Sequence, residues 1–431
     1  MVDIKNLKDL TSSELDKLFN RFGEDFSSII TNTVAPIVNE VKTGGDIAVK
    51  KYTEKFDGVK LNEITASKEE IEHGFNSVSQ NVIEAFTAAK NNIEEFHLHQ
   101  KRDTIMYERD GTILGIMCQP IDSAAIYVPG GKASYPSSVL MGVIPAMIAG
   151  VKDISVITPP DKNGSVAAPI LAVCKILGVE KIIKAGGAQG IAAAGFGTET
   201  VAKSEIIVGP GNIYVTAAKT YMFSLGVIQI DSLAGPSEVL IIADEGANPK
   251  WVAFDFLSQA EHEERALAVL VTTSQKLAGK VKDEIEKDIN SLCGRHEIKK
   301  AALKNSLILV TDSIEEAVDF SNRFGPEHME FIVRSPLDYL HSIKNVGSLF
   351  LGDYAPVAVG DYFSGTNHIL PTGGAARFSS GASVETFMRK TTFQYLNKES
   401  LLRAKDAINI MSEAEGFADK HGGSVNVRFE K

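Results

Sequence analysis

The sequence predicts an α/β fold with two Rossmann-like parallel sheets, and three patterns support this. Short β-branched runs alternate with helical stretches in two blocks, residues 106–223 and 239–333, as expected of βαβ units. Glycine-rich turns follow three strands of the first block, although none is a G-x-G-x-x-G or P-loop motif. A chain of 431 residues also exceeds one ordinary core. We therefore expect several structural units.

Composition and charge limit the kinds of molecule that the protein is expected to bind and the compartment in which we expect it. The formal net charge is −11, which disfavours nucleic acid because phosphate binding needs a basic surface. No apolar run approaches the ~20 residues that span a bilayer, and the polar N-terminus is unlike a signal or transit peptide. Cys118, Cys174 and Cys293 are too far apart for a disulfide framework or a CxxC site, and we assign them no role. We expect a cytoplasmic protein.

The N-terminal hundred residues are expected to be helical. A Thr-Ser-Ser-Glu capping box at 11–14 lies in a short arm, 1–24, that is too small to fold alone. Apolar residues at helical spacing predict several helices over 27–100, including a long one at 82–97. The histidines here lie on or near polar faces and are expected at the surface: His73, His97 and His99.

The first α/β block places three turns at one edge of a sheet. Ligands of parallel sheets bind at the carboxyl ends of strands, where turns 129–132, 186–190 and 209–212 must lie. Small residues there let a backbone approach a phosphate, but they also serve merely as tight turns, and both interpretations stay open. The predicted strands are 112–119, 124–128, 154–158, 181–184 and 205–208, and the predicted helices are 137–149, 169–177 and 214–223.

A helix beginning near Pro249 carries the first candidate metal ligands. Asn248 can cap it, and proline suits its first position. Gln259 and His262 are three residues apart, so both side chains point to one face. An amide oxygen and an imidazole can bind a metal if other ligands arrive from elsewhere. A solvated polar helix end is the alternative.

The second block adds an acid and a base. Pro326 restricts the backbone before a strand, so Glu327 and His328 lie at its mouth. Adjacent Glu and His form a plausible acid/base pair, although in isolation two polar residues at a strand start are more often structural. The other predicted strands are 239–243, 268–272 and 306–310, and the other predicted helices are 275–292 and 314–322.

The C-terminal fifth of the chain is less regular. Residues 351–378 form a glycine- and proline-rich stretch, which predicts an ordered functional loop. Asp361 is its candidate ligand. His368 is a second candidate, although a role in structural hydrogen bonds is favoured for it. The tail, 383–431, contains a β-like stretch, a helix at 398–415 and a terminal strand at 424–429. A segment of roughly 50 residues cannot build a large core, so it should pack on another unit or subunit.

Taken together, these motifs resemble the histidinol dehydrogenase family over nearly the whole chain. Ordered motifs spread over so much sequence are far more specific than any one of them. They are YVPGGKASYPSSVLM (127–141), AGGAQGIAA (185–193), VGPGN (208–212), AGPSEVLIIAD (234–244), FLSQAEH (256–262), FGPEH (324–328), GDYFSGTNHILPTGGAARFSSG (360–381) and AEG…H…SV (414–425).

The resemblance implies a site, position by position. Zinc ligands would be Gln259, His262, Asp361 and His421. The catalytic pair would be Glu327 and His328. Substrate contacts would be Ser237, Gln259, His262, His328, Asp361, Glu415 and His421. NAD contacts would be Tyr127, Gln189 and Asn212.

The resemblance also implies an activity and an organisation. L-Histidinol would be oxidised to L-histidine through L-histidinaldehyde with two NAD⁺, the last step of histidine biosynthesis, with one zinc ion per subunit of a homodimer. The implied domains are an N-terminal arm (1–24), a first α/β domain with most of the zinc and catalytic site (25–126 with 242–382), an NAD-contacting Rossmann-like domain (127–241) and an exchanged dimerisation tail (383–431).

Two alternatives remain at this point. The protein could be a related zinc dehydrogenase acting on another small alcohol, such as a sulfonated diol. It could also be a catalytically silent nucleotide-binding scaffold, although retention of the zinc set and both acid/base residues argues against that.

Overall fold

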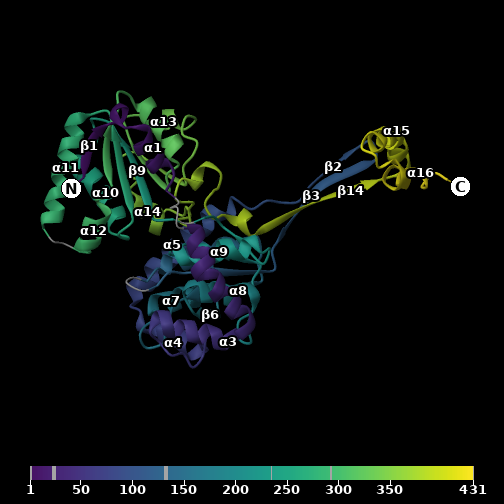
Figure 1. Ribbon diagram of the computed structural model, residues 1–431, viewed down its shortest axis with the longest axis horizontal. Helices are drawn as coiled ribbons and strands as arrows, with labels where there is room; N and C mark the ends of the chain where they lie inside the picture. The colour runs from purple at the N-terminus through teal and green to yellow at the C-terminus, as the bar shows by residue number, and fades with distance from the viewer. Residues whose placement is uncertain (1, 22–25, 131–133, 234, 292–293, 431) are drawn as a thin grey trace. The chain divides into compact units, whose positions relative to one another are not determined.

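The structure, a computed structural model, describes residues 2–21, 26–130, 134–233, 235–291 and 294–430 (Figure 1). The chain forms two compact units. We call Met1–Gln100 with Asp122–Phe387 the main unit, and Lys101–Ile121 with Met388–Lys431 the small unit. The main unit contains two parallel sheets, so the predicted α/β class is confirmed.

The six-stranded sheet of the main unit has the order β1-β11-β10-β9-β12-β13 and is parallel throughout. Every residue of β9 and β10 is buried, and both strands are nearly continuous apolar runs, as expected where helices cover both faces of a parallel sheet. The strands are β1 (Asp3–Asn6), β9 (Glu238–Ala243), β10 (Leu267–Thr272), β11 (Leu307–Val310), β12 (His328–Ile332) and β13 (Ser348–Leu351).

Helices cover both faces of this sheet (Figure 1). The cluster on one face is built from α10, α11 and α12, and the cluster on the other from α1 and α13. The helices are α1 (Ser12–Phe19), α10 (Pro249–Ala260), α11 (Gln275–Asn290), α12 (His296–Ala302), α13 (Ile314–Phe324) and α14 (Val357–Tyr362). Short 3₁₀ turns are η1 (Leu7–Asp9), η3 (Pro336–Tyr339), η4 (Ala375–Arg377) and η5 (Val384–Phe387).

The N-terminal arm is only partly helical. Its capping box is present, with Glu14 N–H donating to Thr11 Oγ1 and Thr11 N–H donating to Glu14 Oε2. Before it, however, β1 adds an edge strand to the six-stranded sheet by pairing with β11. No local pattern announces this strand, because its backbone hydrogen bonds come from residues about 300 positions later.

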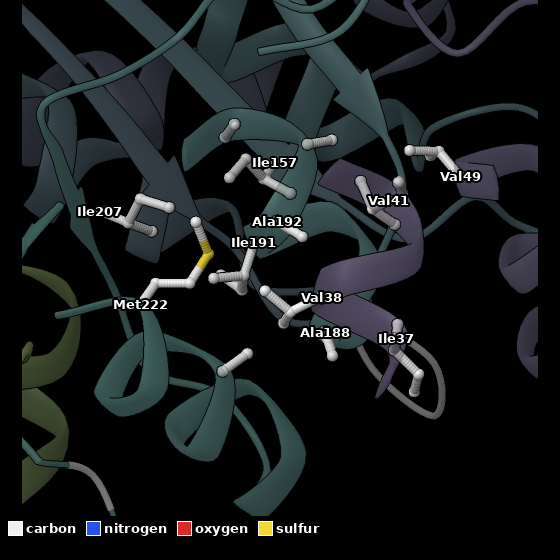
Figure 2. Close-up of a cluster of buried hydrophobic side chains, with 14 of the residues drawn as sticks. Ile37, Val38, Val41, Val49, Ile157, Ala188, Ile191, Ala192, Ile207 and Met222 are labelled. Carbon is white, nitrogen blue, oxygen red and sulfur yellow. The ribbon is translucent and has the colours of Figure 1, made fainter. Parts of the chain in front are cut away.

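The five-stranded sheet has the order β6-β5-β4-β7-β8 and is also parallel. Figure 2 shows part of its core, where Ile37, Val38 and Val41 face Ala188, Ile191 and Ala192. The strands are β4 (Ser123–Tyr127), β5 (Asp153–Thr158), β6 (Lys181–Lys184), β7 (Ile206–Val208) and β8 (Gln229–Ile230). The helices between them are α6 (Pro136–Ala149), α7 (Ala168–Leu177), α8 (Gly187–Phe196) and α9 (Ile213–Ser224).

The N-terminal helices pack differently from the grouping expected above. Instead of joining 242–382, α3 packs on α8, α4 on α7 and α5 on α6, all around the five-stranded sheet. An apolar helix face marks burial but does not specify which sheet it covers. The other domain limits stay a prediction. The segments are α2 (Phe26–Ile29), η2 (Ile30–Val34), α3 (Ala35–Asp57), α4 (Lys68–Ser77) and α5 (Gln80–Leu98).

The prediction of a surface position was wrong for His97. Its side chain is 0% exposed, with Nδ1 2.8 Å from Ile93 O and Nε2 3.2 Å from the amide of Asn367. Those two partners satisfy both ring nitrogens, so burial is not penalised by a lost hydrogen bond. His73 and His99 are exposed, as predicted.

The small unit is an antiparallel sheet, β14-β3-β2, with a helical C-terminus. Its elements are β2 (Ile105–Arg109), β3 (Thr112–Pro120), β14 (Met388–Leu396), α15 (Lys398–Ala414), η6 (Ala418–Gly422) and α16 (Gly423–Asn426). The predicted terminal strand at 424–429 was wrong, since helical turns occupy 418–426. A side-chain amide pair between Asn409 and Asn426 (3.0 Å) holds these turns on α15. Among the described residues, no helix is both long and apolar enough to cross a membrane.

Candidate active site

The end of α10 presents a buried amide without partners. Asn248 Oδ1 accepts from Lys250 N (3.0 Å) and Trp251 N (3.4 Å), so the predicted cap is confirmed. Gln259 lies in the last turn, 1% exposed, and neither amide atom has a hydrogen-bond partner among the described residues. Such an amide needs a ligand to offset its lost hydration. His262 follows in a turn closed by its N–H to Gln259 O (3.2 Å), which keeps the predicted spacing beyond the helix end.

Glu327 and His328 are fixed by the first residue of the neighbouring strand β9. Glu327 Oε2 accepts from Glu238 N (2.8 Å), and His328 Nδ1 donates to Glu238 O (3.1 Å). The carbonyl contact requires a proton on Nδ1, so Nε2 is the atom free to exchange protons. That atom lies 3.6 Å from Asp361 Oδ1. Because Glu238 and His328 begin their strands, this site lies at the amino ends of the six-stranded sheet.

Asp361 is positioned by α14 and by His368. Glu330 Oε1 on β12 accepts from Val357 N (2.8 Å), which ties the start of α14 to the sheet. His368 Nδ1 donates to Asp361 O (3.0 Å), and its Nε2 lies 3.2 Å from Ser138 Oγ. The expected structural role of His368 is confirmed.

The electrostatics create proton carriers near neutral pH. Burial raises the pKa of Glu327 to about 8, against the lowering effect of the His328 charge. Burial lowers the pKa of His328, but Glu327 and Asp361 outweigh it and raise the pKa to about 9. Burial would raise the pKa of Asp361, but His328 more than offsets this and lowers it. Burial lowers the pKa of His262, so its imidazole is held neutral.

Comparison with known proteins decides the family. The family model described as histidinol dehydrogenase matches residues 20–429. A histidinol dehydrogenase of Leptospira biflexa is 48% identical over 421 residues, covering 97% of each chain, and one of Methanocaldococcus jannaschii is 49% identical over 416 residues, covering 96% of each. The crystal structure of histidinol dehydrogenase from Elizabethkingia anophelis matches with a TM-score of 0.92 at 39% identity, over 99% of this chain and 98% of that one.

The chain belongs to the histidinol dehydrogenase family. The resemblance inferred from the motifs is therefore confirmed, and the protein is an enzyme of that family. Histidinol dehydrogenases are NAD-dependent oxidoreductases of histidine biosynthesis that oxidise histidinol to histidine, and the family uses zinc.

The residues of the main unit fit the family's zinc. Gln259 supplies an unpartnered amide, and His262 lies close enough to Asp361 for the carboxylate charge to affect its pKa. No group of three or more His, Cys, Asp or Glu side chains is arranged for a metal within the part of the chain that the structure describes. The amide of Gln259 lies outside those residue types, and His421 belongs to the small unit, so the predicted set is divided between units.

The other predicted substrate contacts differ in burial. Ser237 precedes β9, is partly buried, and donates its N–H to Glu263 Oε1 (3.3 Å). Glu415 is the C-cap of α15 and His421 lies in η6, and both side chains are exposed in the small unit.

The positions predicted to contact NAD lie at the carboxyl ends of the five-stranded sheet. Tyr127 ends β4 and accepts a hydrogen bond from Gly187 N (3.3 Å). Gln189 is buried in the first turn of α8. Asn212 caps α9 by accepting from Tyr214 N (3.0 Å) and Val215 N (3.1 Å). Of the turn 129–132, residues 131 and 132 lie outside the described residues.

Two buried ion pairs at the site were missed by sequence reasoning. Arg21 binds Glu238 through Nε–Oε1 (2.5 Å) and Nη2–Oε2 (2.9 Å), and so fixes the strand start that holds Glu327 and His328. Lys219 pairs with Asp231, whose Oδ2 accepts from Gly209 N (2.8 Å) in the turn before α9. The 12-residue spacing of the second pair gave no local signal, and neither did the 217 residues between Arg21 and Glu238.

Proposed function

We propose that the protein oxidises L-histidinol to L-histidine in two hydride transfers to NAD⁺, through L-histidinaldehyde. The observation that carries this proposal is the buried, unpartnered amide of Gln259, three residues before His262, whose pKa is affected by the charges of Asp361 and of the hydrogen-bonded His328. Family membership supports the substrate. The pair supplies the proton transfers that oxidation of an alcohol to an acid requires.

We assign one zinc ion per subunit to Gln259, His262, Asp361 and His421. A neutral imidazole, an ionised carboxylate and an amide oxygen form a nitrogen and oxygen donor set that suits Zn²⁺. The ends of α10 and α14 contribute the negative pole of each helix, which also favours a cation. When bound, zinc would anchor the imidazole and amine of histidinol and so orient the carbinol.

His328 is the base of the first oxidation. The carbonyl of Glu238 holds its Nδ1–H, which aims Nε2 toward Asp361 and the substrate space. Engaging Asp361 with a cation weakens its hold on the Nε2 proton and frees that atom to take the hydroxyl proton. Bound NAD⁺ supplies the hydride acceptor.

Glu327 serves the second oxidation. Its carboxylate takes a proton from the water that attacks the aldehyde, and a base then assists collapse of the hydrate to the acid. Burial raises the pKa of Glu327 to about 8, which makes its ionised form a stronger base than an exposed carboxylate. Ser237 and Glu415 complete the substrate contacts, Glu415 by pairing with a cationic part of histidinol.

We further propose a homodimer in which the small unit completes the neighbouring subunit's site. Exposed Glu415 and His421 are available for this role. NAD⁺ would bind at Tyr127, Gln189 and Asn212, where α8 and α9 direct their N-terminal amides toward its phosphates. A cytoplasmic location rests on cysteine usage, with Cys118 and Cys174 both free thiols.

A stoichiometric assay tests this function. L-Histidinol and NAD⁺ should yield L-histidine and two NADH per histidinol, a chelator should abolish turnover, and added Zn²⁺ should restore it. Absence of turnover at millimolar L-histidinol would contradict the proposed function. Turnover of a sulfonated diol but not of L-histidinol would show that the same site oxidises another alcohol.

A further inference from the structure

A second group of unpartnered polar atoms lies on the helices of the five-stranded sheet. Thr53 Oγ1 and Asp57 Oδ2 on α3 and Gln189 Oε1 on α8 are buried, and none has a hydrogen-bond partner among the described residues. The Thr53 and Gln189 side chains are 0% and 1% exposed. Buried polar atoms are nearly always paired in native proteins, so three together indicate a missing ligand.

These atoms gather around Tyr127. Thr53 and Asp57 are four residues apart on α3, so they share a helix face, and α3 packs on α8. The hydroxyl of Tyr127 accepts from Gly187 N at the start of α8. Burial is the main cause that raises the pKa of Tyr127 to about 12, and the nearby Asp57 charge adds to it. The group thus lies at the carboxyl end of β4, where parallel sheets bind ligands.

The chemistry of the group selects its ligand. Gln189 Oε1 only accepts hydrogen bonds, and so does Asp57 Oδ2 while the carboxyl is ionised. The Thr53 hydroxyl can accept or donate. Burial raises the pKa of Asp57 to about 6, so the carboxyl is ionised at neutral pH. No ion pair to Asp57 is formed by a Lys or Arg of the described ranges. A ligand rich in hydroxyl donors fits this environment, and a phosphate placed against the Asp57 carboxylate is repelled.

We propose that Asp57 and Thr53 bind the ribose hydroxyls of the adenosine half of NAD⁺, and that the Asp57 carboxylate excludes NADP⁺ by repelling its 2′-phosphate. This inference rests on the proposed NAD⁺ site at Tyr127 and Gln189. The adenosine half is assigned because α3 packs on α8 and α9, whereas the hydride acceptor must reach His328 on β12. Carboxylates serve this purpose in other dinucleotide sites.

Calorimetric binding of NAD⁺ and NADP⁺ to the zinc-loaded full chain tests the proposal. Asp57→Asn should weaken NAD⁺ binding about tenfold and strengthen NADP⁺ binding, so that the preference for NAD⁺ falls about 100-fold. Thr53→Val should weaken NAD⁺ binding several-fold and leave NADP⁺ discrimination in place. Glu54→Gln removes the same charge from an exposed position of the same helix and should leave both affinities within about twofold of wild type.

Distinct outcomes separate this inference from the proposed function. If the wild-type protein binds NAD⁺ but Asp57→Asn keeps the full preference for NAD⁺ over NADP⁺, the ribose assignment alone is overturned. A wild-type protein that binds no NAD⁺ overturns both. Steady-state KM values for the two cofactors should follow the dissociation constants. If Asp57→Asn fails to fold, Asp57→Ser carries the same expectation.

Discussion

The two parallel sheets of the main unit present opposite edges to their candidate ligands. At the six-stranded sheet, Glu238 and His328 begin their strands, and the neighbouring helix α10 ends there. At the five-stranded sheet, Tyr127 ends its strand, and α8 and α9 begin beyond the strand ends. Helix C-termini favour cations and N-termini favour anions. The proposed zinc site therefore lies at the amino ends of the strands of one sheet, which we call the zinc-type edge. The proposed dinucleotide site lies at the carboxyl ends of the strands of the other sheet, which we call the dinucleotide-type edge.

The edges also differ in how their buried charges are held. Glu238 and His328 each have a charged partner, namely Arg21 and Asp361. Asp57 has none within the described ranges. A paired edge stabilises the protein before ligand arrives, whereas an unpaired one is stabilised by the ligand itself. Substitutions at the two edges should therefore change the stability of the ligand-free protein in opposite directions.

The largest effects are expected at the zinc-type edge, whose proposed ligand set includes His421 of the small unit. His328→Asn should lower kcat by about 10²–10⁴ while zinc and fold remain, because it removes the base. His421→Ala should lose zinc and activity, while the melting temperature of the zinc-free protein should not fall, since the side chain is exposed. Zinc analysis and NADH formation measure both.

Mixing these two inactive variants tests exchange of the small unit. If it is exchanged, a refolded equimolar mixture recovers about a quarter of wild-type activity, because half the dimers carry one intact site of two. Activity no greater than the sum of the separate variants would contradict exchange.

The next largest effect concerns the paired charge beneath this edge. Arg21→Met should lower the free energy of unfolding by about 3–5 kcal/mol, because it leaves Glu238 buried without its partner. Urea denaturation gives the value. Lys5→Met, which breaks the half-exposed Lys5–Glu14 pair, is the matched control and should cost under about 1 kcal/mol. Equal losses in the two variants would remove the distinction between buried and exposed pairs.

The smallest effect has the opposite sign. Burial raises the pKa of Asp57 from 3.8 to about 6, so its contribution to stability is full below pH 4 and is lost as pH rises through 6. Asp57→Asn should therefore stabilise the ligand-free protein at pH 7.5 by about 1–2 kcal/mol, with the gain disappearing near pH 4. Thermal unfolding at both pH values measures this, and a gain that persists at pH 4 would show that ionisation is not its cause.

Local patterns predicted what local forces determine. The cap of α10 and the buried strands β9 and β10 follow from neighbouring residues, and they appear where expected. The motifs also identified the family, because their order along the chain carries information that no single motif holds.

The remainder depends on partners distant in sequence. His97 was assigned to the surface because its polar partner, Asn367, lies 270 residues away. The edge strand β1 and the Arg21–Glu238 pair have the same origin. The terminal helix α16 replaces a predicted strand, and it packs on α15 instead of pairing with a strand.

The pairing of β3 with β14 bears on the order of events during synthesis. Pro120 pairs with Met388, so β3 leaves the ribosome long before its partner exists. At 5–20 residues per second the wait is on the order of tens of seconds. A two-stranded hairpin of β2 and β3 is marginal in water, so this edge stays open to other chains meanwhile. Slow translation between codons 120 and 388 would then favour aggregation of nascent chains, whereas in the finished polypeptide β14 covers this side of β3.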